Sequence, residues 1–431
     1  MKLSVIGCGY LGAVHAAAMA KLGHEVVGID TDAEKIAKLA AGSAPFHEPG
    51  LQELLADGIA AGRLRFTTDI TEAADARVHF VAVGTPQLAD GDGADLRYVH
   101  GAIESLRPVL RPGALVVGKS TVPVGTAAVL VDRIAETGAS LAWNPEFLRE
   151  GFAVADTLTP DRIVYGVVDD ADAGLLDEVY RAALEAGTPR IVTDLATAEL
   201  VKTAANAFLA TKISFINAMA EIAEVTGADV TTLADAIGHD ARIGRRFLNA
   251  GIGFGGGCLP KDIRAFTARA EELGRAESVA FLRQVDAINL RRRERVVEHA
   301  IELLGGSVFT RRIAVLGLTF KPDSDDIRDS PALDVAARLY GLGADVVATD
   351  PHGIDNSRAK HPQLEYVADV GDALRGAELA VLVTEWAAYR ELDPRRTAEL
   401  MAVPRIIDAR NALDPASWKA AGFEYRGLGR S

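Results

Sequence analysis

The first 195 residues alternate short apolar runs with longer segments in which polar and apolar positions mix. Such alternation predicts a mostly parallel β-sheet whose strands are joined by helices on both faces. One of the joining helices is expected at His15–Leu22. The expected strands are Leu3–Ile6, Glu25–Ile29, Val78–Val83, Leu115–Gly118 and Leu141–Trp143.

A different pattern begins near residue 196. Ala196–Val225 contains neither Gly nor Pro and is rich in helix-favouring residues, so we expect one long helix. Asp194 has the residue type of an N-cap, and Gly227 has that of a C-terminal stop. A helix of this length typically bridges domains or forms a subunit interface. Helical character continues to about residue 305, with an interruption at the glycine-rich stretch Gly251–Gly257.

The last segment repeats part of the first. Gly343–Asp350 follows the pattern of Gly23–Asp30, and each places an acidic residue at the end of a second strand, seven positions after a glycine. The last segment lacks the full glycine pattern of the first. We therefore predict an α/β protein. Two Rossmann-like domains, residues 1–195 and 306–431, are joined by a long central helix and a helical middle region, residues 196–305.

Composition narrows the function. At about 150 residues per domain, the 431 residues fit three domains, and the net charge of −14 disfavours nucleic-acid binding but not small anionic ligands. Apolar runs stay below the roughly 20 residues of a membrane span, and Met1–Gly7 lacks signal-peptide features, which indicates a cytoplasmic protein without membrane contact. Two cysteines, Cys8 and Cys258, disfavour disulfides and a Cys-rich metal site, and we expect no metal.

A dinucleotide site is predicted at the N-terminus. Gly7, Gly9 and Gly12, with Tyr10 and Leu11 between them, form G-x-G-x-x-G after a strand, where backbone can approach a pyrophosphate at a helix N-terminus. Asp30, 18 residues after Gly12, ends the next strand and favours NAD over NADP, because its carboxylate binds ribose hydroxyls and repels a 2′-phosphate. The competing interpretation is an α/β turn that binds nothing. Lys35 lies near the ribose or is a solvated helix residue.

Two further loops follow expected strands. Thr85 lies in Val83-Gly84-Thr85-Pro86, and Thr121 lies in Lys119-Ser120-Thr121-Val122-Pro123. Ligands of open α/β sheets lie beyond the carboxyl ends of strands, so both loops are expected to face cofactor or substrate. Proline turns also have a purely structural explanation.

The stretch from Gly253 to Asp262 is the most informative in the chain. Its glycines allow a close approach of backbone to a ligand, and Cys258 is followed by Lys261 and Asp262. A cationic neighbour favours the thiolate, which is the nucleophilic form. A cysteine alone is more often an inert buried residue, as we expect for Cys8.

Other polar residues have a catalytic and a structural interpretation. Lys202 and Asn206 are four apart and share a helix face, where a lysine acts as an acid, a base or an oxyanion stabiliser, or is merely solvated. Glu146 and Glu150 follow a strand, where paired carboxylates position water or only stabilise the local fold.

These motifs together resemble the UDP-glucose 6-dehydrogenase family, within the nucleotide-sugar dehydrogenases, from Gly7 to about Arg410. The resemblance implies oxidation of an alcohol to an aldehyde with NAD, addition of Cys258 as a thiohemiacetal, a second oxidation to a thioester, and hydrolysis. Lys202 would stabilise the oxyanion with Asn206 as partner, and Asp262 would transfer protons or activate water. The matching segments are Asn144–Gly151, Glu199–Lys202 with Asn206, Arg242–Gly244, Gly253–Asp262, Leu318–Lys321 and Asp326–Pro331.

The resemblance also implies ligand contacts. Thr121, Glu146 and Glu150 would assist catalysis. Arg242 would reach a neighbouring subunit's substrate, which implies a homodimer or larger assembly. Two positions depart from the family, because many relatives have Ser at Gly257 and Glu at Ala218. The implied cofactor contacts beyond the turn and Asp30 are Lys35, Thr85, Thr121, Glu150, Lys261 and Arg328. The implied substrate contacts are Glu146, Phe147, Leu148, Arg149, Glu150, Lys202, Asn206, Arg242, Phe247, Leu248, Asn249, Gly251, Phe254, Gly255, Phe320, Lys321 and Arg410.

Alternatives remain open at this point. By resemblance, Asn206–Phe215 and Arg242–Gly251 look closest to the UDP-glucose branch of the family, with GDP-mannose as the second candidate. Pro260-Lys261-Asp262 disfavours the branch that acts on N-acetylated UDP-sugars. A two-electron hydroxyacid dehydrogenase would leave Cys258 unexplained. A sensor of NAD or nucleotides would not need a nucleophile.

Overall fold

The structure is a computed structural model that describes residues 1–430. The chain divides into two compact units. The first comprises Met1–Ala205 and Ala268–Gly274, and the second comprises Asn206–Thr267 and the described residues from Arg275 onward. Each unit contains its own β-sheet.

The first unit contains an eight-stranded sheet in the order β3-β2-β1-β4-β5-β6-β7-β8. Neighbouring strands are parallel except β6 and β7. The first six positions have the strand order of a dinucleotide-binding fold, so ligands are expected at the carboxyl ends of the strands. The strands are β1 (Lys2–Ile6), β2 (Glu25–Ile29), β3 (Leu64–Thr67), β4 (Val78–Val81), β5 (Leu115–Gly118), β6 (Ser140–Trp143), β7 (Ile163–Gly166) and β8 (Arg190–Thr193).

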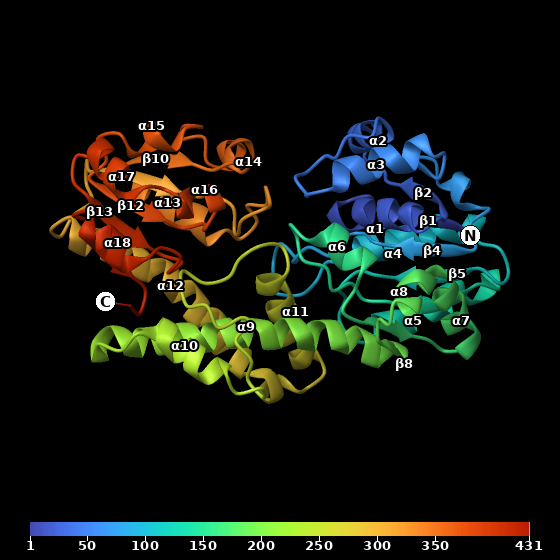
Figure 1. Ribbon diagram of the computed structural model, residues 1–431. Coiled ribbons are helices and arrows are strands. Elements are labelled where there is room, and N and C mark those ends of the chain that lie inside the picture. The colour runs from blue at the N-terminus through green and yellow to red at the C-terminus, as the bar shows by residue number, and fades with distance from the viewer. Residues whose placement is uncertain (431) are drawn as a thin grey trace. The chain divides into compact units, whose positions relative to one another are not determined.

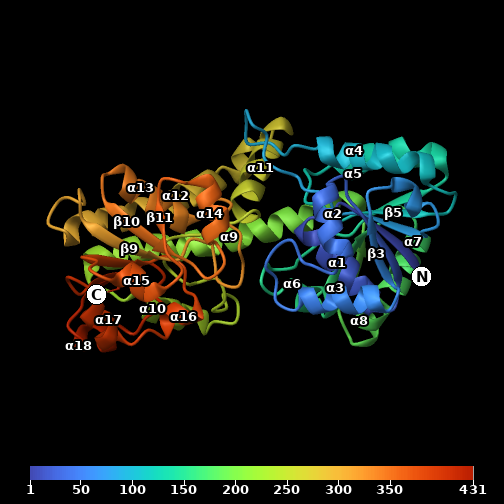
Figure 2. The same cartoon turned by 90° about the horizontal axis from the view of Figure 1, so that it is seen from above.

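Helices cover both faces of this sheet (Figure 2). Alternate residues of a strand point to opposite faces, and in β1 Val5 belongs to one apolar core while Ile6 belongs to the other. The first core includes α1, and the second includes α4 and α5. The helices are α1 (Tyr10–Lys21), α2 (Ala33–Ala40), α3 (Leu51–Ala60), α4 (Arg97–Leu106), α5 (Thr126–Ile134), α6 (Ala153–Leu158), α7 (Asp170–Val179) and α8 (Arg181–Glu185), with single 3₁₀ turns η1 (Ile70–Ala73), η2 (Arg107–Val109) and η3 (Ala135–Thr137).

The second unit contains a six-stranded parallel sheet in the order β11-β10-β9-β12-β13-β14. Val315 and Leu316 of β9 face different apolar cores, so this sheet is also covered on both faces. Its strands are β9 (Arg312–Leu316), β10 (Asp345–Thr349), β11 (Glu365–Tyr366), β12 (Leu379–Leu382), β13 (Arg405–Asp408) and β14 (Glu424–Gly427). The helices that follow α9 are α10 (Val230–Gly238), α11 (Leu259–Glu272), α12 (Phe281–Leu303), α13 (Pro331–Gly341), α14 (Ile354–Lys360), α15 (Val370–Leu374), α16 (Ala387–Arg390), α17 (Pro394–Leu400) and α18 (Pro415–Ala420), with the 3₁₀ turn η4 (Ala276–Val279).

The predicted long helix is confirmed as α9 (Leu195–Thr226), which is uninterrupted in Figure 1. Asp194 caps it, because its Oδ1 accepts a hydrogen bond from the backbone N–H of Thr197 at 2.8 Å. Gly227 follows the last turn with a φ of 75°, a conformation that suits glycine.

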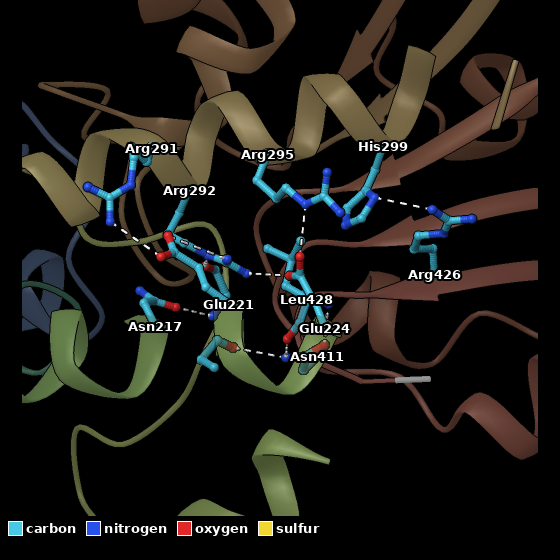
Figure 3. A network of polar contacts seen from close by, with 12 residues as sticks. Asn217, Glu221, Glu224, Arg291, Arg292, Arg295, His299, Asn411, Arg426 and Leu428 are labelled. Atoms are coloured by element: carbon cyan, nitrogen blue, oxygen red, sulfur yellow. Dashed lines mark hydrogen bonds and ion pairs between the residues drawn. The ribbon is translucent and has the colours of Figure 1, made fainter. Parts of the chain in front are cut away.

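A buried charged network attaches the later half of α9 to α12 within the second unit (Figure 3). Arg292 of α12 is 0% exposed and donates to Glu224 of α9 at 3.1 Å. Arg295 donates to the other oxygen of Glu224 at 2.8 Å. Burial raises the pKa of Glu224, but the hydrogen bonds and charges of Arg295 and Arg292 outweigh it, so the pKa is lowered overall. The ionised carboxylate therefore holds the two helices together.

The internal repeat is confirmed in three dimensions. The backbone N–H of Gly7 donates to Ile29 at 2.8 Å, and that of Gly317 donates to Thr349 at 2.9 Å. Asp30 accepts from the N–H of Cys8 at 2.8 Å, and Asp350 accepts from that of Leu318 at 2.7 Å. Both sheets therefore begin with the same strand–turn–strand arrangement, and the predicted fold of two Rossmann-like domains is confirmed.

The sequence analysis missed three strands of the first sheet. Arg190–Thr193 is largely exposed, and its two apolar residues are adjacent, so its sequence shows no apolar alternation. Ile163–Gly166 is fully buried but only four residues long. Leu64–Thr67 mixes buried and exposed positions over four residues. Within residues 1–430, no helix has the length and apolar character needed to cross a membrane.

Candidate active site

The glycine-rich turn of the first unit leaves no room for side chains at two positions. A Cβ on Gly12 would lie 1.8 Å from the carbonyl oxygen of Gly7, and Gly7 itself has a φ of 89°. A Cβ on Gly9 would meet nothing within 4 Å. Helix α1 begins at Tyr10 directly after this open position, so its unpaired N–H groups can receive a phosphate.

Asp30 lies at the carboxyl end of β2, beside this turn. Its Oδ2 accepts from the N–H of Cys8 at 2.8 Å and from Nζ of Lys35 at 3.1 Å. Its Oδ1 accepts from the N–H of Asp32 at 3.0 Å, and the side chain keeps 12% of its surface exposed. The carboxylate is thus fixed in position and still accessible.

The loops after β4, β5 and β6 are connected to one another. Thr85 Oγ1 donates to the carbonyl of Thr121 at 2.8 Å, and Ser120 Oγ donates to the carbonyl of Val83 at 2.7 Å. Lys119 Nζ lies 3.1 Å from Oε2 of Glu146. The structure therefore brings Thr85, Thr121 and Glu146 to one end of the sheet.

Glu146 folds back on its own loop. Its Oε1 accepts from the N–H groups of Phe147 at 2.9 Å and Leu148 at 3.1 Å. Lys202 Nζ lies 5.5 Å from the centre of the Phe147 ring, within cation–π range. Arg149 is exposed and forms a bidentate pair with Asp156. Glu150 is buried.

Glu48 is a functional-site residue that the sequence analysis missed. It is 6% exposed and accepts hydrogen bonds from the hydroxyl of Tyr10 and from the N–H groups of Gly151 and Ala153. Burial, followed by the bond to Glu48, raises the pKa of Tyr10 well above its usual range. Glu48 thereby joins the glycine turn to the loop that carries Glu150. Tyr10 lies 38 positions from Glu48 in sequence, and Gly151 and Ala153 lie 103 and 105 positions away, so no local pattern indicates this role.

Cys258 lies in the second unit, immediately before helix α11, and its side chain is exposed. The carbonyl of Cys258 accepts from the N–H of Asp262 at 3.0 Å, so both residues belong to the first turn. Asp262 is 3% exposed and accepts from Nδ2 of Asn206 at 2.7 Å and from Nζ of Lys261. A helix N-terminus favours negative charge, which suits a thiolate nucleophile.

The glycine loop before Cys258 is closely packed. A Cβ on Gly255 would lie 2.3 Å from the carbonyl oxygen of Asp329, and one on Gly256 would lie 2.7 Å from the Phe320 ring. A Cβ on Gly257 would lie 2.3 Å from the guanidinium carbon of Arg328. The departure at Gly257 thus leaves space for the Arg328 side chain beside the cysteine.

Hydrogen bonds from side chains to the backbone hold the start of the same loop. Asn289 is 0% exposed, and its amide accepts from the N–H of Phe254 at 2.7 Å and donates to its carbonyl at 2.9 Å. The Arg410 guanidinium donates to the carbonyls of Gly253 and Phe320, both at 2.9 Å. The N–H of Gly251 donates to Asn217 at 2.8 Å.

The remaining candidate substrate residues of the second unit differ in exposure. Arg242 is exposed and pairs with Asp240 at 2.6 Å. Phe247 is exposed, with a φ of 66° that is strained for an aromatic residue. Leu248 is buried, whereas Asn249 is exposed and accepts from Arg245 at 2.8 Å. Lys321 Nζ lies 5.3 Å from the Phe320 ring centre.

Comparison with known proteins agrees with this arrangement. Three models of the UDP-glucose/GDP-mannose dehydrogenase family match the chain: the NAD binding domain at residues 1–184, the central domain at 196–291 and the UDP binding domain at 314–415. The chain belongs to this family. The UDP-glucose 6-dehydrogenase of Rhizobium meliloti is 42% identical over 100% of both chains, and the UDP-glucose 6-dehydrogenase YwqF of Bacillus subtilis is 41% identical over 100% of this chain and 98% of the relative.

The solved structure of a UDP-glucose dehydrogenase from Pyrobaculum islandicum has a TM-score of 0.91 to this chain. It is 40% identical and covers 100% of this chain and 98% of its own. As a member of the UDP-glucose/GDP-mannose dehydrogenase family, the chain uses NAD. The open position at Gly9 and the fixed, accessible carboxylate of Asp30 fit a diphosphate and a ribose of that cofactor.

Proposed function

We propose that this chain is an NAD-dependent UDP-glucose 6-dehydrogenase, which oxidises the primary alcohol of the sugar to a carboxylate in two steps. The observation that carries the proposal is the 42% identity over the full length of both chains to a UDP-glucose 6-dehydrogenase. The residues around Cys258 support it, because a two-electron dehydrogenase needs no nucleophile. GDP-mannose is the alternative substrate, since the family name includes both sugar nucleotides.

Cys258 is the proposed nucleophile. When bound, NAD accepts a hydride in each oxidation, so two NAD molecules are reduced for each sugar. After the first oxidation, Sγ of Cys258 adds to the aldehyde carbon and the carbonyl oxygen takes a proton, which gives a thiohemiacetal. Loss of a hydride and a proton from this adduct gives a thioester. Water then attacks the thioester carbon and releases the carboxylate and the thiolate.

The other site residues have proposed roles in the same reaction. Lys202 stabilises the negative oxygen of the reacting carbon, and Asn206 is a hydrogen-bond partner in that step. Asp262 moves protons or activates water, and its bonds to Asn206 and Lys261 fix its carboxylate for that task. Thr121, Glu146 and Glu150 assist the same steps.

The proposed division of labour follows three segments. Residues 1–195 bind NAD through the glycine turn, Asp30, Lys35, Thr85 and Thr121, with Glu150, Lys261 and Arg328 as further contacts. Residues 196–305 supply the central helix and the nucleophile, and residues 306–431 bind the UDP-sugar. The matches of the three family models support this division. The proposed sugar-nucleotide contacts are Glu146, Phe147, Leu148, Arg149, Glu150, Lys202, Asn206, Arg242, Phe247, Leu248, Asn249, Gly251, Phe254, Gly255, Phe320, Lys321 and Arg410.

The proposed assembly is a homodimer through α9. Phe208, Phe215 and Ile222 are spaced seven residues apart and are 66%, 49% and 56% exposed, so they form an apolar stripe on one helix face. A seven-residue repeat suits the packing of two copies of a helix against each other. Sedimentation of the wild type and of Phe215→Glu tests the assembly, and a dimeric F215E variant would contradict it. The cytoplasmic location stays a prediction.

The first test is the amount of NADH formed from limiting UDP-glucose, with GDP-mannose and UDP-N-acetylglucosamine measured in parallel. Two NADH per UDP-glucose, with little from the other sugars, is the expected result. Two NADH per GDP-mannose, with none from UDP-glucose, would favour the alternative activity, oxidation of GDP-mannose. Cys258→Ala is expected to abolish acid formation while the binding of UDP-glucose persists, and one NADH per sugar in the wild type would exclude the thioester route.

A further inference from the structure

Lys119 is a buried charge to which the reaction described above assigns no role. It follows β5 directly, and its side chain is only 2% exposed. Lysine is almost never buried to this degree unless its ammonium group is paired, because the loss of hydration is costly. The ammonium group of Lys119 is therefore expected to be paired inside the protein.

Four oxygen atoms surround the Lys119 ammonium. Nζ lies 3.1 Å from Oε2 of Glu146 and 2.9 Å from Oδ1 of Asn144. The carbonyl of Asn144 lies at 3.4 Å and the hydroxyl of Tyr180 at 3.3 Å. Glu146 is the only carboxylate among these partners, so it is the counter-charge of the lysine.

The neutral partners are themselves held in fixed orientations. Asn144 Nδ2 donates to the carbonyl of Val164 at 2.9 Å, which leaves Oδ1 directed at the ammonium. The hydroxyl of Tyr180 donates to the same Oδ1 at 2.6 Å, so its oxygen lone pair remains available to Lys119. The rings of Phe80 and Tyr180 lie 5.8 Å from Nζ on the apolar side. The lysine is thus confined to one position.

Glu146 is in turn fixed at both oxygens. Oε1 accepts two backbone N–H groups of its own loop, and Oε2 faces Lys119. The loop bonds alone would permit the carboxylate to move with the loop. The ion pair with Lys119 attaches the carboxylate to the end of β5 instead. The backbone N–H of Lys119 donates to the carbonyl of Val81 in β4 at 2.9 Å. The carboxylate is therefore positioned against the rigid centre of the sheet.

We propose that Lys119 is a positioning residue that holds the Glu146 carboxylate in its working place and compensates its charge. The proposal rests on the dehydrogenase function proposed above, in which Glu146 assists the proton and water steps. In this role Lys119 acts through Glu146. Its loss is expected to slow the chemistry and to leave the binding of NAD intact, since Glu146 is not among the proposed NAD contacts.

The main test compares Lys119→Met with the wild type in steady-state oxidation of UDP-glucose. We expect kcat to fall about 10- to 100-fold, because misplacement of a catalytic group by about 1 Å has an effect of that size. The KM for NAD is expected to stay at the wild-type value. An unchanged kcat, or a rise in KM without a fall in kcat, would overturn the proposal.

A double-mutant cycle shows whether Lys119 acts through Glu146. In a Glu146→Gln background, adding Lys119→Met is expected to change kcat by no more than about twofold, since the two sites are coupled. The same large fall in both backgrounds would contradict the proposal. This comparison also serves if K119M alone does not fold, because the double variant leaves no unpaired charge buried.

Tyr180→Phe is the matched control. It removes one bond to Asn144 and one to the ammonium but keeps the Lys119–Glu146 pair. Its kcat is expected to fall much less than that of K119M, and an equal fall would mean that packing of the network, not the position of Glu146, matters. A wild-type chain that does not oxidise UDP-glucose would overturn the proposed function and, with it, this role of Lys119.

Discussion

Asp30 uses one carboxylate for two purposes. Three hydrogen bonds, from Cys8, Asp32 and Lys35, hold it at the end of β2, and it remains accessible on the side of the glycine turn. A negative group in this place attracts the hydroxyls of an unmodified ribose and repels a phosphate on the same sugar. Selection of the cofactor therefore depends on a residue that also shapes the turn.

Replacement of this carboxylate is expected to lower kcat/KM with NAD more than kcat/KM with NADP. For Asp30→Ala, kcat/KM with NAD should fall about 10- to 100-fold, the effect of losing hydrogen bonds to a charged group of about 1.5–3 kcal/mol. Steady-state kinetics with both cofactors measures the change. Lys35→Ala removes another proposed NAD contact but keeps the carboxylate, so it is expected to keep the preference for NAD over NADP. A ratio of kcat/KM for NAD to that for NADP unchanged in D30A would refute this role of Asp30.

At the residue scale, the sequence predicted what local spacing determines. Asp30 was placed because its distance from Gly12 along the chain reflects one helix and one strand. Glu48 and Lys119 were not recognised, because their partners are brought near by the sheet: Lys119 meets Asn144 from 25 positions away, and Glu48 meets Gly151 from 103. A single sequence carries no signal for such non-local contacts.

Glu199 connects two elements of the first unit. It is 2% exposed, and its oxygens accept from the N–H groups of Gly125 at 2.7 Å and Ala127 at 2.6 Å. A side chain of α9 thus caps the start of α5. Burial raises the pKa of Glu199, and the backbone bonds oppose that rise.

Removal of this cap should destabilise the first unit. For Glu199→Ala we expect a loss of about 1–2 kcal/mol in the free energy of unfolding, the usual effect of losing an N-cap. Urea denaturation monitored by circular dichroism measures it. Glu199→Gln keeps one acceptor and should lose less, so equal losses in both variants would argue against a capping role.

At the element scale, long regular patterns were easier to predict than short ones. The ends of α9 agree within one residue, because Asp194 and Gly227 mark them chemically. The strands of four residues were missed where apolar alternation was too brief to distinguish a strand from a loop. Parallel pairing of distant strands also depends on contacts that no single stretch contains.

The network around Glu224 makes the stability of the second unit dependent on pH. The folded-state pKa of Glu224 lies below its ordinary value of 4.5, so its stabilisation is present above that pH and is lost as pH falls through the folded-state pKa. Burial, and then Arg295, lower the pKa of His299, which likewise disfavours folding below its ordinary 6.5. Arg426 and Glu302 face the same histidine.

Glu224→Gln separates these contributions. At about pH 7 it should melt at a lower temperature than the wild type, and the difference should shrink as the pH falls below about 4.5 and through the lowered folded-state pKa of Glu224. Differential scanning calorimetry across this range measures both. A difference in melting temperature that does not depend on pH would mean that the Glu224 charge contributes nothing.

The two sheets begin with the same strand–turn–strand arrangement but differ in the carboxylate at the end of the second strand, Asp30 in one and Asp350 in the other. Asp350 is 2% exposed, and its oxygens accept from the N–H groups of Leu318, Thr319, His352 and Gly353 and from Trp386. Both carboxylate oxygens are therefore occupied within the protein and are not available to ribose hydroxyls. The second sheet therefore retains the turn of a dinucleotide fold without the means to select one.

We accordingly expect one NAD site per chain, even though two NAD molecules are reduced for each sugar. Isothermal titration calorimetry of the wild type with NAD should give about one equivalent per chain. Asp30→Ala is expected to abolish that binding or weaken it strongly, whereas a second equivalent that survives in D30A would place another site elsewhere in the molecule.

The unequal surroundings of the two sulfur atoms have a practical consequence. Cys8 is 0% exposed, and burial, with the nearby charge of Asp30, raises the pKa of its thiol far above the usual range. Cys258 is exposed at the start of a helix. A thiol-reactive dye or spin label should therefore react with Cys258 alone, without prior mutagenesis of Cys8. The label would report on ligands that bind beside that sulfur, and protection by a ligand would be visible as lost incorporation.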